Sequence, residues 1–283
     1  MNSPREKITW IKPSRSWFDI DWKELWDGRE LLLLLVKRDV QVVYKQTILG
    51  PAWFLIQPVL MAMVFSVVFG RVAKIPTAGL PHILFYLSGL LIWNFFSGAL
   101  NGAANSFSHG SALFSKVYFP RLIIPLTFPL SHMVFLFWNF IVFLLFYFWY
   151  IFTGHAFCPS WWICLLPFLL LYVGLVALGV GLVVAALTTK YRDLRFAMPF
   201  ILQVWMYSTP VIFSLDGATT PWIKWVLFLN PLTIGVEGFR FMFFGTTPVT
   251  LSAVVTGVAV MSIFLVCGFG AFNRVQRNFV DTI

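Results

Sequence analysis

The sequence predicts an all-α polytopic membrane protein with six transmembrane helices. The prediction rests on the hydrophobic composition and on the recurrence of apolar stretches of membrane-spanning length. The chain of 283 residues is 59% hydrophobic and only 11% charged. A single soluble core cannot bury that much apolar surface at this length, so lipid has to solvate much of it. Apolar stretches also recur at about the 20 residues needed to cross a bilayer, although the fifth is short. The six stretches are residues 52–70, 82–107, 122–153, 161–188, 197–213 and 248–272.

The positive charges predict how the chain is oriented in the membrane. Of the 20 Lys and Arg residues, nine precede the first stretch, two lie between the second and third, three between the fourth and fifth, and two after the sixth. Because cytoplasmic segments carry an excess of Lys and Arg, both termini are expected in the cytoplasm. The four cations expected on the opposite side are Arg71, Lys74, Lys224 and Arg240.

Several functional classes lack their signatures in this sequence. The net charge of +9 sits at the ends of the apolar stretches, without a basic patch interleaved with aromatics, so nucleic acid is not an expected partner. The three cysteines have no metal-ligand spacing, and we expect neither a metal nor a cofactor in this chain. The sequence has no G-x-x-x-x-G-K-[ST] motif and no His–carboxylate grouping suited to catalysis. We therefore expect a non-enzyme, with ATP and Mg²⁺ bound by a separate subunit if transport is uphill.

Residues 1–50 are expected to form a cytoplasmic segment with two amphipathic helices at the membrane interface, within 17–26 and 30–46. The basic side of the second helix should meet anionic lipid phosphates. Asp39 falls on its apolar face. The favoured interpretation is that Asp39 pairs with a nearby cation at a helix contact, and the alternative is a role in substrate uptake. The basic side carries Lys37, Arg38 and Lys45.

A connecting loop, NSFSHGSALFSKVYFPRLIIP, carries more apolar side chains than a connector needs. It places Phe114 and Tyr118 beside Lys116 and Arg121. Exposed aromatics among charges favour burial by a protein partner. The alternative is that they anchor the third span at the membrane interface. The later loop TTKYRDLR is similar but more polar.

Four collinear motifs resemble one family of membrane proteins. They are VKRDVQVVYKQTILGPAWFLIQPV, LFSKVYFPRLIIP, LTTKYRDLRFAMPFILQVWMYSTPVIF and NPLTIGVEGFR. Their order and separations resemble the membrane-spanning permease subunit of bacterial ABC-2-type polysaccharide exporters, which serve O-antigen, capsule and teichoic acid export. The likeness covers nearly the whole chain from about residue 30, and four motifs in order make it specific.

The resemblance implies a permease of the bacterial cytoplasmic (inner) membrane that pairs with a second copy of itself and binds two copies of an ATP-binding subunit. It would export a polysaccharide linked to undecaprenyl diphosphate. It also implies three parts: segment 1–50, a six-span domain 51–273 and a cytoplasmic tail 274–283. Within the domain, 108–121 would be the coupling loop and 214–245 short re-entrant gate helices between spans five and six. The residues expected to dock the ATPase are Phe114, Lys116, Tyr118, Arg121, Arg192 and Asp193.

A sliding glycan chain calls for an aromatic-lined channel, because sugar rings stack their C–H faces on aromatic side chains. The family's placement of spans one and five around the channel, at the dimer interface, makes Trp53, Phe54, Trp205 and Tyr207 the candidates. Lys37, Arg38 and Lys45 are candidates for the place where the lipid diphosphate enters. The alternative is that these three cations only set topology.

Two further points stay open at this stage. Glu237 and Arg240 lie one helical turn apart, which favours a structural ion pair, with a channel-lining pair that contacts sugar as the alternative. The function also has alternatives: an ABC-2 exporter of another lipid or drug shares the fold. A polyprenyl-phosphate-dependent membrane transferase is less favoured, since it should show carboxylates for metal and acid–base chemistry.

Overall fold

The computed structural model describes residues 22–45, 49–107, 119–157, 159–215 and 226–280. Within these ranges the regular secondary structure is entirely helical, with no strand, which confirms the predicted fold class. The helices in chain order are α1 (Trp22–Asp27), α2 (Arg29–Tyr44), the 3-10 turn η1 (Gly50–Ala52), α3 (Trp53–Phe65), the π-helix η2 (Ser66–Val72), α4 (His82–Ala104), α6 (Ile123–Phe152), the 3-10 turn η3 (Trp161–Leu165), α7 (Leu166–Lys190), α8 (Leu194–Tyr207), α10 (Pro231–Phe244) and α11 (Leu251–Val280).

Five helical segments in the described ranges are long and apolar enough to cross a membrane. They are Trp53–Val72, His82–Ala104, Ile123–Phe152, Trp161–Lys190 and Leu251–Val275. The fifth predicted stretch corresponds to α8, which has 14 residues and ends at Tyr207. At 1.5 Å per residue α8 is about 21 Å long, short of a hydrocarbon core of about 30 Å. The count of six spans therefore stays a prediction.

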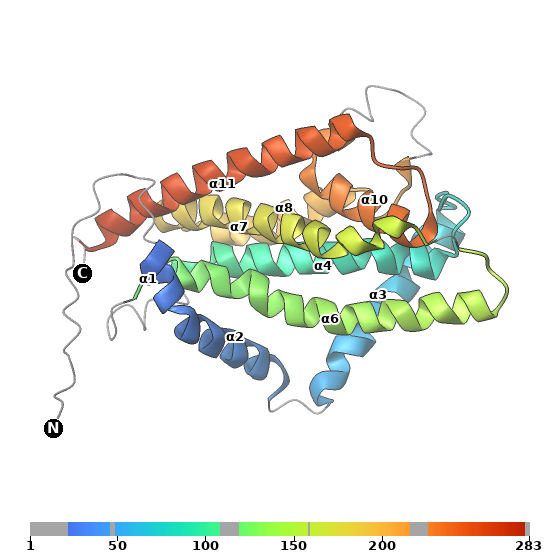
Figure 1. Cartoon of the computed structure of the whole chain (residues 1–283), viewed down its shortest axis with the longest axis horizontal. Coiled ribbons are helices and arrows are strands. Elements are labelled where there is room, and N and C mark those ends of the chain that lie inside the picture. The colour runs from blue at the N-terminus through green and yellow to red at the C-terminus, as the bar shows by residue number, and fades with distance from the viewer. Residues whose placement is uncertain (1–21, 46–48, 108–118, 158, 216–225, 281–283) are drawn as a thin grey trace.

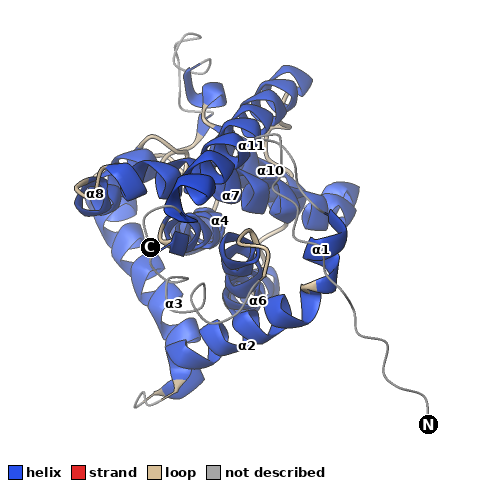
Figure 2. Ribbon diagram, turned by 90° about the vertical axis from the view of Figure 1, so that its left-hand side faces the viewer, coloured by secondary structure: helices blue, strands red, loops and turns tan. Residues whose placement is uncertain are grey.

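The helix α4 lies at the centre of the bundle. In the most apolar part of α4, 78% of the residues are buried. The corresponding share is 17% to 28% in the spans that contain α3, α6 and α11. Figure 2 looks along the molecule and shows α4 and α7 in the middle, surrounded by α2, α3, α6, α8 and α11. A helix that is apolar all round and surrounded in this way contributes packing on every side.

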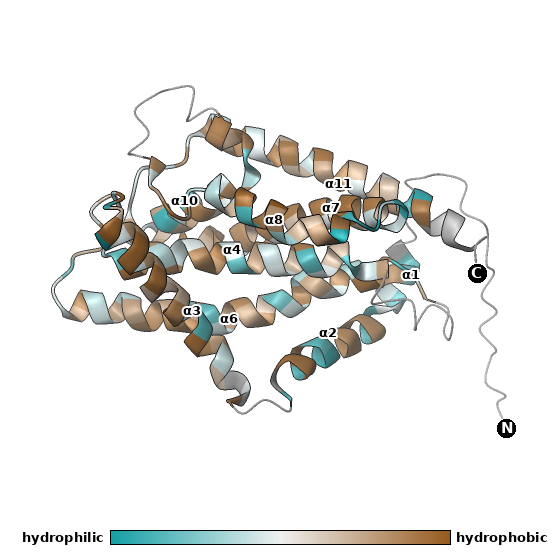
Figure 3. Ribbon diagram, turned by 180° about the vertical axis from the view of Figure 1, so that it is seen from behind, coloured by the Kyte–Doolittle hydropathy of each residue, from teal (hydrophilic) through white to brown (hydrophobic). Residues whose placement is uncertain are grey.

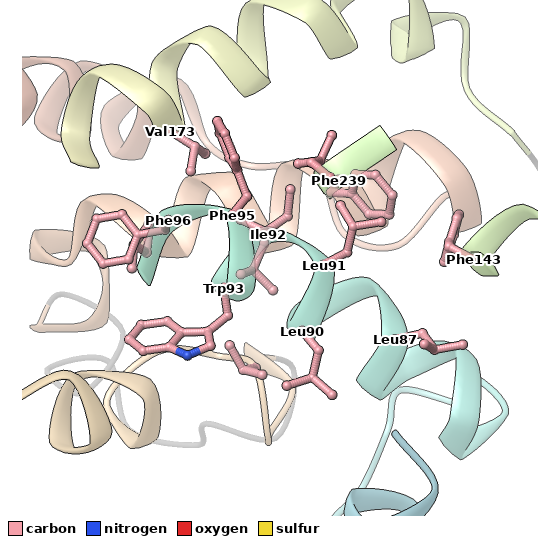
Figure 4. Close-up of a cluster of buried hydrophobic side chains, with 14 of the residues drawn as sticks. Leu87, Leu90, Leu91, Ile92, Trp93, Phe95, Phe96, Phe143, Val173 and Phe239 are labelled. Carbon is pink, nitrogen blue, oxygen red and sulfur yellow. The ribbon is translucent and has the colours of Figure 1, made fainter. Parts of the chain in front are cut away.

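Apolar side chains of α4 form the core with three other helices. Figure 4 shows residues from Leu87 to Phe96 of α4 beside Phe143 of α6, Val173 of α7 and Phe239 of α10. The rings of Phe143 and Phe239 lie 5.1 Å apart, edge to face, which aromatic pairs prefer. This core joins α10 to the long helices although α10 is too short to span a bilayer.

The helices α7 and α11 pack in contact at two glycines. A Cβ atom added to Gly268 would lie 2.5 Å from the carbonyl oxygen of Gly179, so neither position has room for a side chain. Small residues allow this close packing of membrane helices. Further toward the start of each helix, Tyr172 of α7 lies against Gly257 of α11, so the two helices run in the same direction. The chain between them must therefore travel back along the bundle (Figure 1).

Replacing Gly268 by alanine should destabilise the protein by about 1–3 kcal/mol, because the added methyl group meets backbone that cannot rotate away. Gly174→Ala on α7 is the matched control, since its added Cβ would meet the nearest atom at an ordinary 3.4 Å. The measurement is the midpoint of thermal unfolding in detergent. Equal midpoints for the two variants would contradict the close packing of α7 on α11.

Candidate functional site

The helix α2, which we call the approach helix, packs on the bundle through the buried Leu35, with Leu31 and Leu32 beside it. Leu35 packs with Phe119, Ile123, Ile124 and Phe128 at the start of α6. The candidate uptake cations Lys37, Arg38 and Lys45 are all exposed. The amphipathic pattern of this helix is thus used for a protein contact on one side while its cations stay accessible.

Asp39 changes the availability of one of those cations. Arg38 donates from Nε and Nη2 to the same oxygen of Asp39, at 2.9 and 2.7 Å. The second oxygen of Asp39 is buried and has no hydrogen-bond partner within the described residues. Lys37 and Lys45 form no ion pair in that part of the chain. The two lysines therefore offer more unneutralised charge to an anion than Arg38 does.

The candidate docking residues are only partly within the described chain. Phe114, Lys116 and Tyr118 lie outside the described residues. Arg121 is half-buried in the turn before α6. Arg192 and Asp193 are exposed in the turn between α7 and α8, and an oxygen of Asp193 accepts a hydrogen bond from the backbone N–H of Leu194 at 3.1 Å. Asp193 thus also starts α8, where a negative charge suits the helix dipole.

The four candidate channel aromatics separate into two exposed and two packed side chains. Trp53 on α3 and Tyr207 on α8 are 45% and 49% exposed. Phe54 stacks on Phe135 of α6 with ring centroids 5.0 Å apart. Trp205 packs edge to face on Phe96 and donates from Nε1 to the side chain of Asn230. Figure 3 shows α3 and α8 on the same side of the molecule, in front of α4.

Asn230, which is not among the candidate site residues, joins the end of α8 to the start of α10. Its Oδ1 accepts from Trp205 Nε1 at 3.0 Å and from the Leu232 N–H at 3.1 Å. Its Nδ2 donates to the Ser208 carbonyl at 3.2 Å and to Thr209 Oγ1 at 2.8 Å. The Asn-Pro pair at a helix start is a capping signal that sequence could have used. The partners on α8 required the tertiary structure.

Arg240 makes the most extensive polar contacts of the described interior, and we call its set of contacts the Arg240 network. The side chain is 1% exposed. Nη1 donates to Glu237 at 2.9 Å and to the Pro210 carbonyl at 2.6 Å. The remaining bonds are from Nη2 to the carbonyls of Phe85 and Val211, at 3.2 and 3.1 Å, and from Nε to Ser88 Oγ at 3.3 Å.

Every N–H of the Arg240 guanidinium therefore has an acceptor, since arginine has five. The Cζ atom of Arg240 also lies 3.6 Å from the centre of the Phe85 ring. A side chain at Gly89 would lie 3.0 Å from Nη2, so glycine leaves room for the cation there. The Arg240 network joins α10, α4 and the turn after α8, and no donor is left to contact a sugar.

We expect Arg240→Met to cost about 3–5 kcal/mol of stability, because the buried Glu237 loses the cation that it is paired with. The double variant Glu237→Leu/Arg240→Met removes both charges but still lacks the donors to Pro210 and Val211, so it should recover only part of the loss. Thermal unfolding in detergent measures both, with the exposed Arg192→Met as control. A double variant as stable as the original chain would show that the bonds to the carbonyls contribute little.

Comparison with known proteins agrees with this architecture. A family model described as "ABC-2 type transporter" matches residues 30–244, from α2 to the end of α10. An O-antigen export system permease protein, RfbA, of Myxococcus xanthus is 25% identical over 92% of this chain and 98% of its own length. A Klebsiella pneumoniae protein of the same name is 25% identical over 90% of this chain and 95% of its own. The chain belongs to the ABC-2 type transporter family.

Membership of this family confirms the resemblance inferred from the four motifs. It gives the chain a transport role as a membrane permease and implies an ATP-binding partner. The match includes the approach helix, both central helices and the Arg240 network. All of α11 lies beyond it, although α11 packs closely on α7.

Proposed function

We propose that this chain is the permease subunit of an ATP-driven exporter that moves undecaprenyl-diphosphate-linked, O-antigen-like polysaccharide across the cytoplasmic membrane. The observation that carries the proposal is the end-to-end likeness to permeases named for O-antigen export. A separate ATP-binding subunit, in two copies, would supply the energy. Both termini would lie in the cytoplasm, in line with the distribution of Lys and Arg.

The proposed channel lies between two copies of the chain, at the side formed by α3 and α8. Both helices expose large apolar side chains, and Trp53 and Tyr207 are the exposed aromatics that would meet a glycan. Because α7 and α11 run in the same direction, an intervening crossing is required, and α8 is the segment that would provide it. The packed Phe54 and Trp205 would then support the wall from behind.

The lipid diphosphate would reach this channel from the cytoplasmic end, beside α2. Lys37 and Lys45 are exposed and not paired within the described residues, and cations at this depth attract phosphate groups. Arg38 would contribute less, since Asp39 already accepts two of its hydrogen bonds. The uptake site therefore consists chiefly of the two lysines.

Lys45→Glu should lower export of the lipid-linked glycan by roughly tenfold, because one attraction to phosphate is lost and a repulsion is added. Export is measured as surface glycan in cells whose own permease has been deleted. Lys45→Arg, which keeps the charge, should export normally. Unchanged export by a Lys45→Glu chain that is still inserted and still bound to its ATPase would leave topology as the role of Lys45.

Replacing Phe114, Tyr118 and Arg121 together by alanine should abolish co-purification with the ATP-binding subunit, because the proposed docking loop loses its apolar and cationic contacts. The matched comparison is the Arg192→Ala/Asp193→Ala chain, which alters the other cytoplasmic loop. Insertion is checked by the amount of permease in the membrane fraction. A complex that persists in the triple variant and is lost in the double variant would place docking at residues 188–195.

A further inference from the structure

The outer end of α3 has an unusual backbone conformation. The span continues beyond α3 as the π-helix η2, Ser66–Val72, after which the Ala73 N–H donates to the Val68 carbonyl at 2.9 Å. The Ile75 N–H then reaches back six residues to the Phe69 carbonyl, also at 2.9 Å. π-Helical turns are rare and occur frequently at functional sites. The segment is therefore a place to look for a ligand.

Lys74 ends this helix in a conformation that favours glycine. Its φ is +53°, in the left-handed region, where a Cβ atom crowds the backbone. Helices commonly end on glycine at this position for that reason. Strained positions of this kind cluster at functional sites, and this one carries an exposed ammonium group.

The loop that carries Lys74 is held rigidly on α4. Ile75 packs against the main core. Thr77 donates to the Leu80 carbonyl at 2.7 Å, and His82 at the start of α4 lies 3.2 Å from the same hydroxyl. The backbone that carries the cation is thus positioned before any ligand arrives, which lowers the entropy cost of binding.

Arg71 and Lys74 are both exposed and form no ion pair within the described residues. We call them the outer cation pair. They run against the charge bias that places most Lys and Arg at the cytoplasmic side. Of the four cations expected on the outer side, Arg240 is buried and Lys224 lies outside the described residues. The outer cation pair is thus the accessible positive charge of this part of the chain.

The outer cation pair lies at the end of an exposed apolar surface. Along α3 and its π-helical end the exposed side chains include Leu60, Val64, Val68 and Val72, the last of them 75% exposed. The span of 20 residues is about 30 Å long, the thickness of the hydrocarbon core. Cations at the end of such a surface lie at the depth of lipid phosphates.

We propose that Arg71 and Lys74 bind the diphosphate of the exported isoprenoid-linked product at the outer leaflet. The assignment rests on the proposed function and its orientation. Two cations match a diphosphate, which carries at least two negative charges, better than the single charge of a phosphodiester. Arginine adds paired hydrogen bonds to phosphate oxygens. The uptake lysines and the outer cation pair then lie toward opposite ends of α3, so that the same lipid group is received at one end and held at the other.

The test measures binding of undecaprenyl diphosphate and, separately, of phosphatidylglycerol to the purified full-length permease in complex with its ATP-binding subunit, by native mass spectrometry. A Lys37→Gln/Lys45→Gln background removes binding at the uptake lysines. Adding Arg71→Gln and Lys74→Gln should weaken diphosphate binding about 25-fold, at about fivefold for each charge, and phosphatidylglycerol binding much less. Unchanged diphosphate binding, or an equal loss for both lipids, would overturn the assignment.

Two variants at Lys74 separate charge from backbone conformation. Lys74→Arg should bind as the original chain does. Lys74→Gly relieves the left-handed strain but removes the charge, so its binding should fall as far as that of Lys74→Gln. Full binding by Lys74→Gly would overturn the role of the ammonium group.

Accessibility gives a second and independent measurement. In a chain whose three native cysteines are replaced by serine, Lys74→Cys should react with a membrane-impermeant maleimide in intact spheroplasts, and Lys45→Cys only after permeabilisation. A Lys74→Cys chain that stays unlabelled in spheroplasts would overturn the outer location. The binding assay uses neither ATP nor glycan, so a chain that binds the diphosphate at this site but exports no glycan would refute the proposed function alone.

Discussion

The structure depends on a constraint that lipid imposes: a polar group inside the bundle must find its partners within the protein. Arg240 shows how the chain meets it. All five of its N–H groups have acceptors, on α10 itself, on α4 and on the turn after α8. Three segments that are distant in sequence are thereby held at fixed positions. Asn230 does the same at the other end of α10, where it joins that helix to the last residues of α8.

These contacts divide the molecule into a closely packed part and a peripheral part. The helices α4, α7, α10 and α11 share the core or approach at glycines, while α2, α3 and α8 lie around them (Figure 2). In the proposed mechanism the peripheral helices carry the lysines that receive the lipid, the aromatics that meet the glycan and the cations that hold the product. Packing that fixes one set of helices leaves the other set free to form the walls of a passage between two copies.

Sequence predicted the membrane helices well because a long apolar stretch is stable as a helix in lipid and unstable in water. The ends of the second and third spans were predicted to within about three residues. The fifth span was harder to predict, because α8 stops at Tyr207. The residues that follow it are held by hydrogen bonds from Asn230 and Arg240, which helix propensity does not reveal. The Asp39–Arg38 pair also follows the favoured expectation for a charge on an apolar face, although the partner is its sequence neighbour.

The sequence by itself determined the class of protein, the number of apolar stretches, the expected orientation and the family, because these depend on composition, charge bias and collinear motifs. The tertiary structure decided which candidate residues are exposed and which are committed to packing. It left Trp53 and Tyr207 exposed, whereas Phe54 and Trp205 pack against other helices or bond to Asn230. It also gave every donor of Arg240 an acceptor and Lys74 its left-handed conformation. The physical reason is that each of these outcomes depends on contacts between segments far apart in the chain, and local sequence does not encode those contacts.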